Sequence, residues 1–363
     1  MNKVGIVVFQ NLRYAPFLRF YTNILNEMKN VEYDIIYYNR DISLNEPNCE
    51  NIIPISWCGK GTNAAPKHEK AFNFVLYRKK LIKLLKRKKY DFLIMLMTMP
   101  SVLIEDYLIK NDKGKYIFDI RDYTQEKFKP YYKIEEKLLN NSALNVISSK
   151  GFLKFLPSSK YCICHNLDDE IAKKYKSQQT YIKKTKGPVV ISYIGSISYE
   201  KQCKELMKLV CEDERFCFYF YGNENTSHKV SEYANSLKCP RIKLMGAFLP
   251  NEKRDIYEKS DLVFNCYGND ITLVKYAISN KHYDGALYHR PLLVSPNTVM
   301  SEIAGENAFA LDLDNIDNLN ELFTWYKNLD SEKYISYADK VILSALKENG
   351  ILKENVIKII NNI

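Results

Sequence analysis

Residues 189–201 read VVISYIGSISYEK, and this stretch decides the fold class. The apolar run predicts a strand over 189–195 that is buried on both faces, and a helix is expected to begin near Tyr199. Gly195 ends the strand and lets a ligand approach the backbone closely. Such a turn is often only a connection. It also places a helix N-terminus, with Lys201 in its first turn, where an anion can bind.

The same alternation of strand and helix fills the rest of the chain, which predicts an α/β protein with two doubly wound, Rossmann-like parallel sheets. Strands are expected at 3–9, 33–38, 52–57, 91–97, 115–120, 143–147 and 160–165, and then at 189–195, 216–221, 241–245, 261–266, 292–295 and 308–312. Helices are expected at 15–29, 68–88, 100–110, 131–140 and 149–156, and then at 199–212, 226–237, 251–259, 272–288 and 316–328, with a helical tail over 331–363.

A polar, Lys-rich stretch ending in Gly187-Pro188 predicts where the domains divide. We expect a domain over 1–167, a linker over 168–188, a second domain over 189–345 and a C-terminal helix over 346–363 that packs back on the first domain. Two such domains in series would face a cleft at the carboxyl ends of their strands, where ligands bind in doubly wound sheets.

Composition narrows the class of protein. The 363 residues are 46% hydrophobic, so sizeable cores can form, and the net charge is +10. The nine cysteines contain no CxxC pair, which argues against a zinc or redox site and predicts no metal. Met1-Asn2-Lys3 leads directly into an expected strand, and no apolar run approaches the roughly 18 to 20 residues that span a bilayer. A cytoplasmic protein, peripheral to a membrane or not, is expected.

Residues 280–291, NKHYDGALYHRP, carry the second functional signal. Lys281 and Asp284 stand one helical turn apart, where a carboxylate can accept hydrogen bonds from a ribose diol and a lysine can meet a phosphate. Alone, such a pair is usually a solvated ion pair. Asn280 is expected near the helix start, and Gly285 is expected to permit close packing. Together with Gly195 and Lys201, the pair would describe one nucleotide site.

Four segments of the second half, over about 190–300, resemble the nucleotide domain of retaining family-4-type glycosyltransferases with the GT-B fold. IGSISYEK at 194–201 resembles their strand–Gly-Arg–loop–Glu-Lys pattern, and FYFYGN at 218–223 resembles the next strand with its terminal Gly222. The stretch 242–267 resembles their strand, glycine and Pro-x-Glu helix. NKHYDGALYHRPLLVS resembles their Asn-Lys-x-x-Glu segment. The resemblance implies base contacts near Gly246 and Phe248.

Three positions depart from that family pattern. Ser196 replaces the arginine that follows the glycine, and Asp284 replaces a glutamate. Tyr276 stands where the family has an acid near the donor sugar. Nearby polar residues can compensate, namely Asn269, Asp270 and Lys275.

The first half resembles the acceptor domain of the same enzymes. Residues 118–123, FDIRDY, resemble the strand-end Asp-x-Arg-Asp-x-Trp of bacterial capsule and O-antigen enzymes. Arg121 and Asp122 are therefore expected at the cleft edge as catalytic groups that orient acceptor or donor, although a local salt bridge at the strand end is the alternative. Residues 146–152, with Ser149, resemble the segment that follows. Arg13 and Tyr14 follow the first strand and are expected to face the cleft.

Residues 78–89 carry eight basic side chains and no acid. On a helix this pattern predicts either docking on an anionic membrane surface or a solvated lysine-rich face. The membrane contacts would come from Arg78, Lys79, Lys83, Lys86 and Arg87. No aromatic stacking motif accompanies them, so nucleic acid is not an expected partner.

The resemblance implies transfer of a sugar from a nucleoside-diphosphate sugar, with UDP favoured, to a saccharide or lipid-linked saccharide in surface polysaccharide synthesis. Retention of configuration is implied. No cofactor is expected, because Lys201, Lys281 and the Gly195 backbone would stabilise the leaving diphosphate. Two alternatives stay open, namely a catalytically silent nucleotide-sugar-binding subunit and a nucleotide-sugar epimerase.

Overall fold

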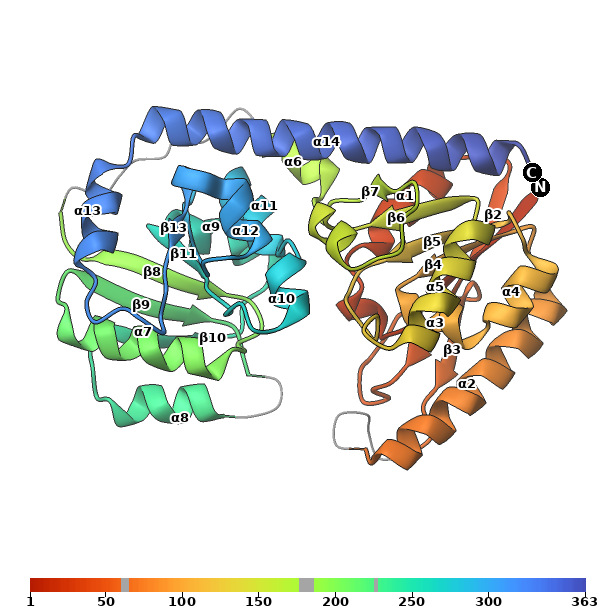
Figure 1. Cartoon of the computed structure of the whole chain (residues 1–363), viewed down its shortest axis with the longest axis horizontal. Coiled ribbons are helices and arrows are strands. Elements are labelled where there is room, and N and C mark those ends of the chain that lie inside the picture. Colours follow the sequence, from red (N-terminus) through yellow and green to blue (C-terminus); the bar gives the residue numbers. More distant parts are fainter. Residues whose placement is uncertain (60–64, 176–185, 225–227) are drawn as a thin grey trace. The chain divides into compact units, whose positions relative to one another are not determined.

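The computed structural model describes residues 1–59, 65–175, 186–224 and 228–363. These residues form two compact units (Figure 1). Unit 1 comprises Met1–Asn166 and Lys347–Ile363, and unit 2 comprises Leu167–Leu346. The linker expected at 168–188 begins as helix α6 (Asp169–Tyr175), and its residues 176–185 lie outside the described ranges.

Unit 1 is built on one parallel sheet with the strand order β3-β2-β1-β4-β5-β6-β7. The described strands are β1 (Asn2–Val8), β2 (Val31–Asn39), β3 (Ile52–Ser56), β4 (Phe92–Leu96), β5 (Tyr116–Ile120), β6 (Leu144–Ile147) and β7 (Cys162–Ile163). Every residue of β4 and β5 is buried, as expected for strands covered by helices on both faces. The short apolar runs of the sequence therefore gave correct strand positions.

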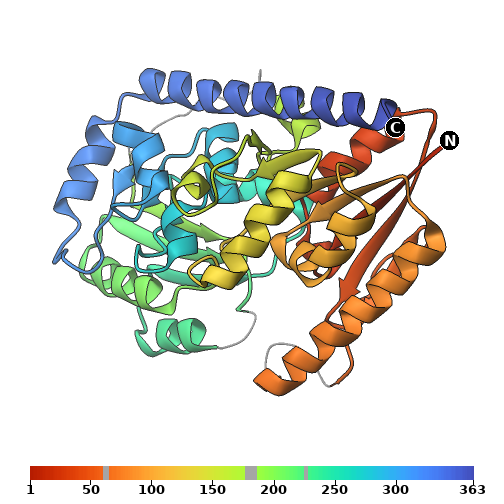
Figure 2. The same cartoon turned by 45° about the vertical axis from the view of Figure 1, so that its right-hand side comes forward.

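Helices cover this sheet on both sides. They are α1 (Leu18–Glu27), α2 (Lys67–Lys88), α3 (Thr98–Leu103), α4 (Glu105–Asn111) and α5 (Lys129–Asn141), with short 3-10 turns at Leu12–Tyr14 and Lys150–Lys154. Figure 2 shows α2 lying along the outside of the unit. The end of the long helix α14 (Ser331–Asn361) also belongs to unit 1, because Leu352, Val356 and Ile360 join the core beneath β1.

Unit 2 repeats the architecture with the strand order β10-β9-β8-β11-β12-β13. Its described strands are β8 (Val189–Ile194), β9 (Phe216–Tyr221), β10 (Ile242–Gly246), β11 (Leu262–Asn265), β12 (Leu292–Val294) and β13 (Phe309–Ala310). The order reverses at β8, which pairs with β9 on one side and β11 on the other. A doubly wound sheet binds its ligand at the carboxyl ends of such a pair of strands.

Two apolar cores flank the sheet of unit 2. On one face pack α7 (Glu200–Glu212), α8 (Lys229–Ser236) and α13 (Asn320–Asn328). On the other face pack α9 (Lys253–Glu258), α11 (Asn280–Leu287), α12 (Val299–Ala304) and the first half of α14. Helix α10 (Thr272–Tyr276) and 3-10 turns at Pro250–Glu252 and Gly305–Asn307 complete the unit.

The fold class expected from the sequence is confirmed, and the differences lie in the helices. The helix expected at 100–110 is two helices that meet at Ile104, and the one expected at 272–288 is α10 and α11. Helix α12 was not expected, and the start of the helix expected at 226–237 lies partly outside the described residues. The tail is one continuous helix. Along the described ranges, no helix is both long and apolar enough to cross a membrane.

Candidate functional site

Three glycines end neighbouring strands at the carboxyl edge of the unit 2 sheet. Gly195 and Gly222 follow β8 and β9 with φ of +119° and +138°, and Gly246, with φ of +78°, is the last residue of β10. The Gly222 N–H donates to Gly246 O over 2.7 Å, and a Cβ on Gly222 would lie 1.9 Å from Gly195 O. Only glycine fits at Gly222. The Gly195 N–H is already donated to Tyr221 O, so Gly195 provides close approach of the backbone rather than a donor for a phosphate.

The turn after Gly195 is held by one tyrosine. Tyr193 on β8 donates its hydroxyl to Ser196 O over 3.0 Å and accepts the Ser198 N–H over 3.1 Å. The Ser196 side chain is exposed, and Tyr199, with φ +61°, starts α7. This local bonding points the N-terminus of a 13-residue helix along the same edge of the sheet, the setting in which an anion is attracted.

Lys281 reaches this edge from α11. A Cβ built on Gly195 would lie 3.8 Å from Lys281 Nζ, which donates to the Tyr267 hydroxyl. The amine also lies over the rings of Tyr193 and Tyr267, 4.9 and 5.2 Å from their centroids, and Tyr199 stacks on Tyr267 at 4.1 Å. Burial lowers the pKa of Lys281 to about 8, although the Asp284 carboxylate opposes the shift. The lysine is thus placed among tyrosines beside Gly195.

Asp284 lies on the same helix and pairs elsewhere. Lys253 Nζ lies 2.6 Å from Asp284 Oδ1, and the Tyr257 hydroxyl donates to Oδ2 over 3.3 Å. The Asp284 side chain is 18% exposed, so a ligand can still reach it. Burial, followed by the negative charge of Asp284, raises the pKa of the Tyr257 hydroxyl well above its ordinary value. The hydroxyl therefore stays protonated and can donate its hydrogen bond to Asp284.

Lys253 was not among the residues predicted from the sequence. It stands 31 positions before Asp284 on a different helix, and no residue spacing connects the two. Asn280 is the first residue of α11, and Ser279 is the N-cap. Gly285 faces its own chain, because a Cβ there would lie 2.8 Å from Arg290 O. Its small size serves packing within the unit.

Other predicted residues of this site lie around its rim. Lys201 Nζ pairs with Asp314 Oδ1 at 2.7 Å, with both side chains more than half exposed. Phe248 follows Gly246 and packs partly buried against the core. The structure therefore brings Gly195 and Lys281 together, whereas Lys201 is directed to a partner in another loop.

Tyr276 and the three polar residues expected to compensate for the missing acid lie on α10 or in the loop before it. The Lys275 amine lies over the Tyr276 ring at 5.9 Å, and Asn269 donates to Pro296 O over 3.0 Å. A Cβ on Gly268 would lie 3.1 Å from Asp270 Oδ1. Asp270 thus folds back over its own loop.

In unit 1, Arg121 follows β5 and turns inward. Its Nη2 lies 2.6 Å from Asp119 Oδ2, and its Nη1 donates to Cys164 O and to Asn166 Oδ1 over 3.2 and 3.0 Å. Tyr21 donates to Asp119 over 2.6 Å. Burial alone would lower the pKa of Arg121, but Asp119 holds it well above the ordinary value. The structure places Arg121 in the local salt bridge that the sequence allowed as its alternative.

Three further residues were predicted near the acceptor, besides Asp122. Burial raises the pKa of Asp122, opposed by the Arg121 charge. Arg13 and Tyr14 are exposed in the turn after β1 and contact each other, with the guanidinium 5.8 Å from the ring centroid. Ser149 is buried and accepts the Gly151 N–H over 3.1 Å, so its hydroxyl caps the 3-10 turn.

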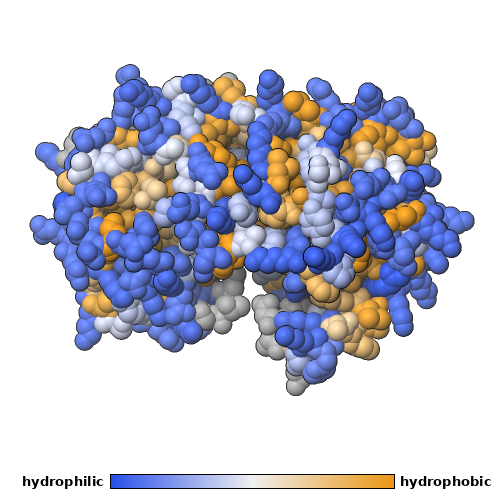
Figure 3. Space-filling view, in the orientation of Figure 1, coloured by the Kyte–Doolittle hydropathy of each residue, from blue (hydrophilic) through white to orange (hydrophobic). Residues whose placement is uncertain are grey.

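Helix α2 has a buried face and a basic face. Its buried side chains are Asn73, Tyr77, Leu81, Leu84 and Leu85. Arg78 forms an exposed bidentate pair with Asp106 of α4 at 2.7 and 2.8 Å. Within residues 78–89 the exposed basic residues are Lys79, Lys80, Lys83, Lys86, Arg87 and the following Lys89. Two apolar residues, Phe72 and Val75, are exposed toward the start of the helix, and Figure 3 shows hydrophilic and apolar side chains together over the visible part of α2.

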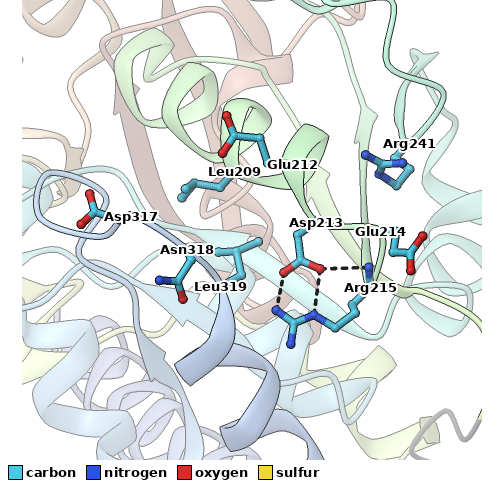
Figure 4. A pocket seen from close by; sticks show the side chains of 9 residues that line it. All are labelled: Leu209, Glu212, Asp213, Glu214, Arg215, Arg241, Asp317, Asn318 and Leu319. Carbon is cyan, nitrogen blue, oxygen red and sulfur yellow. Dashed lines mark hydrogen bonds and ion pairs between the residues drawn. The ribbon is translucent and has the colours of Figure 1, made fainter.

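A pocket of about 640 Å³ opens at the other edge of the unit 2 sheet (Figure 4). Its lining comes from the end of α7 and from the residues before β9, β10 and α13, so the pocket lies at the amino ends of β9 and β10, opposite Gly195. Asp213 binds Arg215 through contacts of 2.6 and 2.8 Å, and Arg241 donates to the carbonyls of Val210 and Cys211. The charges of Asp213, Arg215 and Arg241 are thus engaged within the protein. Within the described part of the chain, no three His, Cys, Asp or Glu side chains are grouped to hold a metal ion.

Comparison with solved structures identifies similar proteins, whereas comparison by sequence identifies none. No protein-family model matches the chain, and no curated protein matches it. Sucrose-phosphate synthase from Thermosynechococcus elongatus superposes with a TM-score of 0.68 at 8% identity, over 100% of both chains. Anabaena HepE, solved with UDP and glucose, gives 0.64 at 11% identity, over 96% of this chain and 98% of that one.

A third similar structure is the UDP-GlcNAc 2-epimerase of Neisseria meningitidis bound to UDP-GlcNAc. It gives a TM-score of 0.53 at 14% identity, over 95% of this chain and all of the other. At such identities the likeness shows the fold, which is GT-B with two Rossmann-like units.

Proposed function

We propose that this chain transfers a sugar from a UDP-sugar to a saccharide or lipid-linked saccharide acceptor during bacterial surface polysaccharide synthesis. The observation that supports it best is the carboxyl edge of β8, where Lys281 lies against Gly195 and Asp284 stays accessible on the same helix. A cation and a carboxylate one helical turn apart suit the diphosphate and the ribose of one nucleotide. The similar structures solved with UDP or UDP-GlcNAc support a uridine donor.

In the proposed reaction, fixed cations stabilise the leaving diphosphate without a bound metal. Lys281 lies next to the glycine edge, and the N-terminus of α7 adds its dipole. Lys201 would join them after leaving Asp314, an exposed partner that holds it weakly. The leaving phosphate oxygen would take the acceptor proton on the same face, which gives retention of configuration. Asp122 would orient the acceptor. Arg121 would hold the segment after β5 in place through its buried pair with Asp119.

The test is nucleotide release. A thermal-shift screen against UDP, GDP, dTDP, CDP and ADP is expected to select UDP, and UDP-sugar with a suitable acceptor is expected to release UDP. A UDP complex with no release against any acceptor would favour a silent binding subunit. That second candidate rests on Tyr276 and Ser196, which stand where the family has an acid and an arginine. Interconversion of the sugar without an acceptor would favour an epimerase.

We also propose that α2 docks the protein on the anionic inner face of the cell membrane. Support comes from its exposed basic residues beside exposed Phe72 and Val75. Each basic residue near such a surface contributes about 1 kcal/mol. Reversing Lys79, Lys83, Lys86 and Arg87 to glutamate is expected to abolish sedimentation with phosphatidylserine vesicles. Arg78 is left unchanged because it binds Asp106. Undiminished sedimentation would indicate a solvated face instead.

A further inference from the structure

Lys253 occupies a position in unit 2 that the nucleotide site, as described so far, does not use. It is the first residue of α9, and its amine lies 2.6 Å from Asp284 Oδ1 with 35% of the side chain exposed. The buried Tyr257, one turn later on the same helix, donates to the other carboxylate oxygen. One helix therefore fixes both oxygens of Asp284. The orientation of that carboxylate is set by α9 rather than by its own helix.

The same lysine also acts on Lys281. Its charge is one of the contributions that lower the pKa of the Lys281 amine, after burial, whereas Asp284 acts in the opposite direction. One carboxylate thus stands between two lysines, and only Lys253 is in direct contact with it. Removing Lys253 would leave Asp284 to act on Lys281 alone.

We propose that Lys253 is a positioning residue of the nucleotide site, which aims the Asp284 carboxylate at the ribose diol and adds a second positive charge beside the diphosphate lysine, Lys281. This inference rests on the proposed function. A carboxylate held from one side can offer its remaining lone pairs to two adjacent hydroxyls. Ordering it in advance also removes an entropic cost of binding.

The groups that face Lys281 allow its titration to be isolated. They are Tyr193 on β8, Tyr199 and Cys203 from the start of α7, Tyr267 after β11, Asp284 on its own helix and Lys253 on α9. Burial raises the pKa of each tyrosine and of Cys203, so these groups keep their protons near pH 8. Among these neighbouring groups and Lys281, only the Lys281 amine is therefore expected to change its charge between pH 7 and 9.

The experiment compares UDP affinity from pH 7 to 9 by calorimetry for wild type, Lys253→Met, Lys253→Arg and Arg254→Met. Arg254 is the matched control, because it is the next residue on α9 and pairs with Glu258 at 2.7 Å. Lys253→Met is expected to weaken binding about tenfold at pH 7, because Asp284 loses the cation that orients it. UDP affinity falls as the pH rises from 7 to 9, and the midpoint of this fall is expected to shift upward by about half a pH unit or more. The reason is that Lys253→Met removes one positive charge near the Lys281 amine.

The loss for Lys253→Met is thus larger at pH 7 than at pH 9, whereas Lys253→Arg and Arg254→Met follow wild type. An unchanged affinity and midpoint for Lys253→Met would overturn the proposal. So would a uniform loss at every pH accompanied by a lower melting temperature, because that is the effect of a purely structural ion pair.

A measurement without nucleotide separates this inference from the proposed function. Lysines carrying 13C-methyl groups can be titrated by NMR, with the Lys281 signal assigned from Lys281→Arg. Lys253→Met is expected to raise the Lys281 midpoint relative to Arg254→Met. If wild type binds no UDP, the proposed function fails and the role of Lys253 toward ribose fails with it. An unchanged Lys281 midpoint overturns the effect of Lys253 on Lys281 even where UDP binds.

Discussion

An acid and a base lie near each other at two places in this protein, and the two pairs are bound in different ways. After β5 in unit 1, Arg121 and Asp119 are both buried and bind each other, with Tyr21, Cys164 O and Asn166 as further partners. Beside β8 in unit 2, Lys281 and Asp284 do not bind each other, and Asp284 remains partly exposed. The first pair is closed by the protein and supports the fold. In the proposed function, the second offers its charges to a nucleotide.

The largest effect is expected from breaking the closed pair. Arg121→Leu leaves the Asp119 carboxylate buried without its cation, which is expected to lower the free energy of unfolding by about 3–5 kcal/mol. Urea denaturation measures this loss. Arg13→Leu is the control, because Arg13 is exposed, and is expected to leave the unfolding midpoint unchanged. Equal urea midpoints for Arg121→Leu and wild type would contradict the statement that the Arg121–Asp119 pair stabilises the fold.

The next largest effect is expected from removing the partly exposed carboxylate of Asp284. Asp284→Ala is expected to weaken UDP binding about 100-fold, or about 2.7 kcal/mol, because two hydrogen bonds from the ribose to a carboxylate are lost. Calorimetry with UDP measures it. Glu258→Ala serves as the control, since Glu258 is exposed and pairs with Arg254 on α9. Retention of wild-type affinity in Asp284→Ala would refute the ribose assignment.

A smaller effect is expected from pH. Because burial lowers the pKa of Lys281 to about 8, its amine is charged at pH 7 and largely neutral at pH 9. Binding of a diphosphate needs the charged form, so affinity is expected to fall about tenfold between these values. For folding the sign is opposite. The buried charge is unfavourable below pH 8, and stability contributed by this group rises between pH 8 and the ordinary lysine pKa. Lys281→Arg is expected to abolish the pH dependence of binding. A flat profile in wild type would contradict this role of Lys281.

The smallest effect concerns the rim. Lys201→Ala is expected to leave the melting temperature unchanged, since its pair with Asp314 is exposed, while turnover with UDP-sugar falls about fivefold, because solvent weakens the effect of an exposed charge. Steady-state kinetics and a thermal melt measure the two. Turnover equal to wild type would place Lys201 outside the diphosphate site.

The sequence predicts the sheets of this protein better than its contacts. Strands covered on both faces appear as short apolar runs, so β4, β5 and β8 are recognisable. The breaks at Ile104 and between α10 and α11 are not, because no Gly or Pro marks them. Gly195 and Lys281 were predicted from motif order. Lys253 was not, because contact between residues 31 positions apart depends on how α9 packs against α11.

Arg121 illustrates the other limit of the sequence. The segment FDIRDY is consistent with both a catalytic arginine and a local salt bridge, and only the direction of the side chain separates them. That direction follows from Asp119, which is fully buried and needs a cation. A pattern of residue types does not encode which acid an arginine meets.

The most direct test of the account is a crystal structure of the protein with UDP. The account predicts the ribose hydroxyls within hydrogen-bonding distance of Asp284 and the diphosphate next to Lys281 Nζ, over the Gly195 turn. UDP bound elsewhere, for instance in the pocket beside Arg215 and Arg241 at the opposite edge of the sheet, would contradict it.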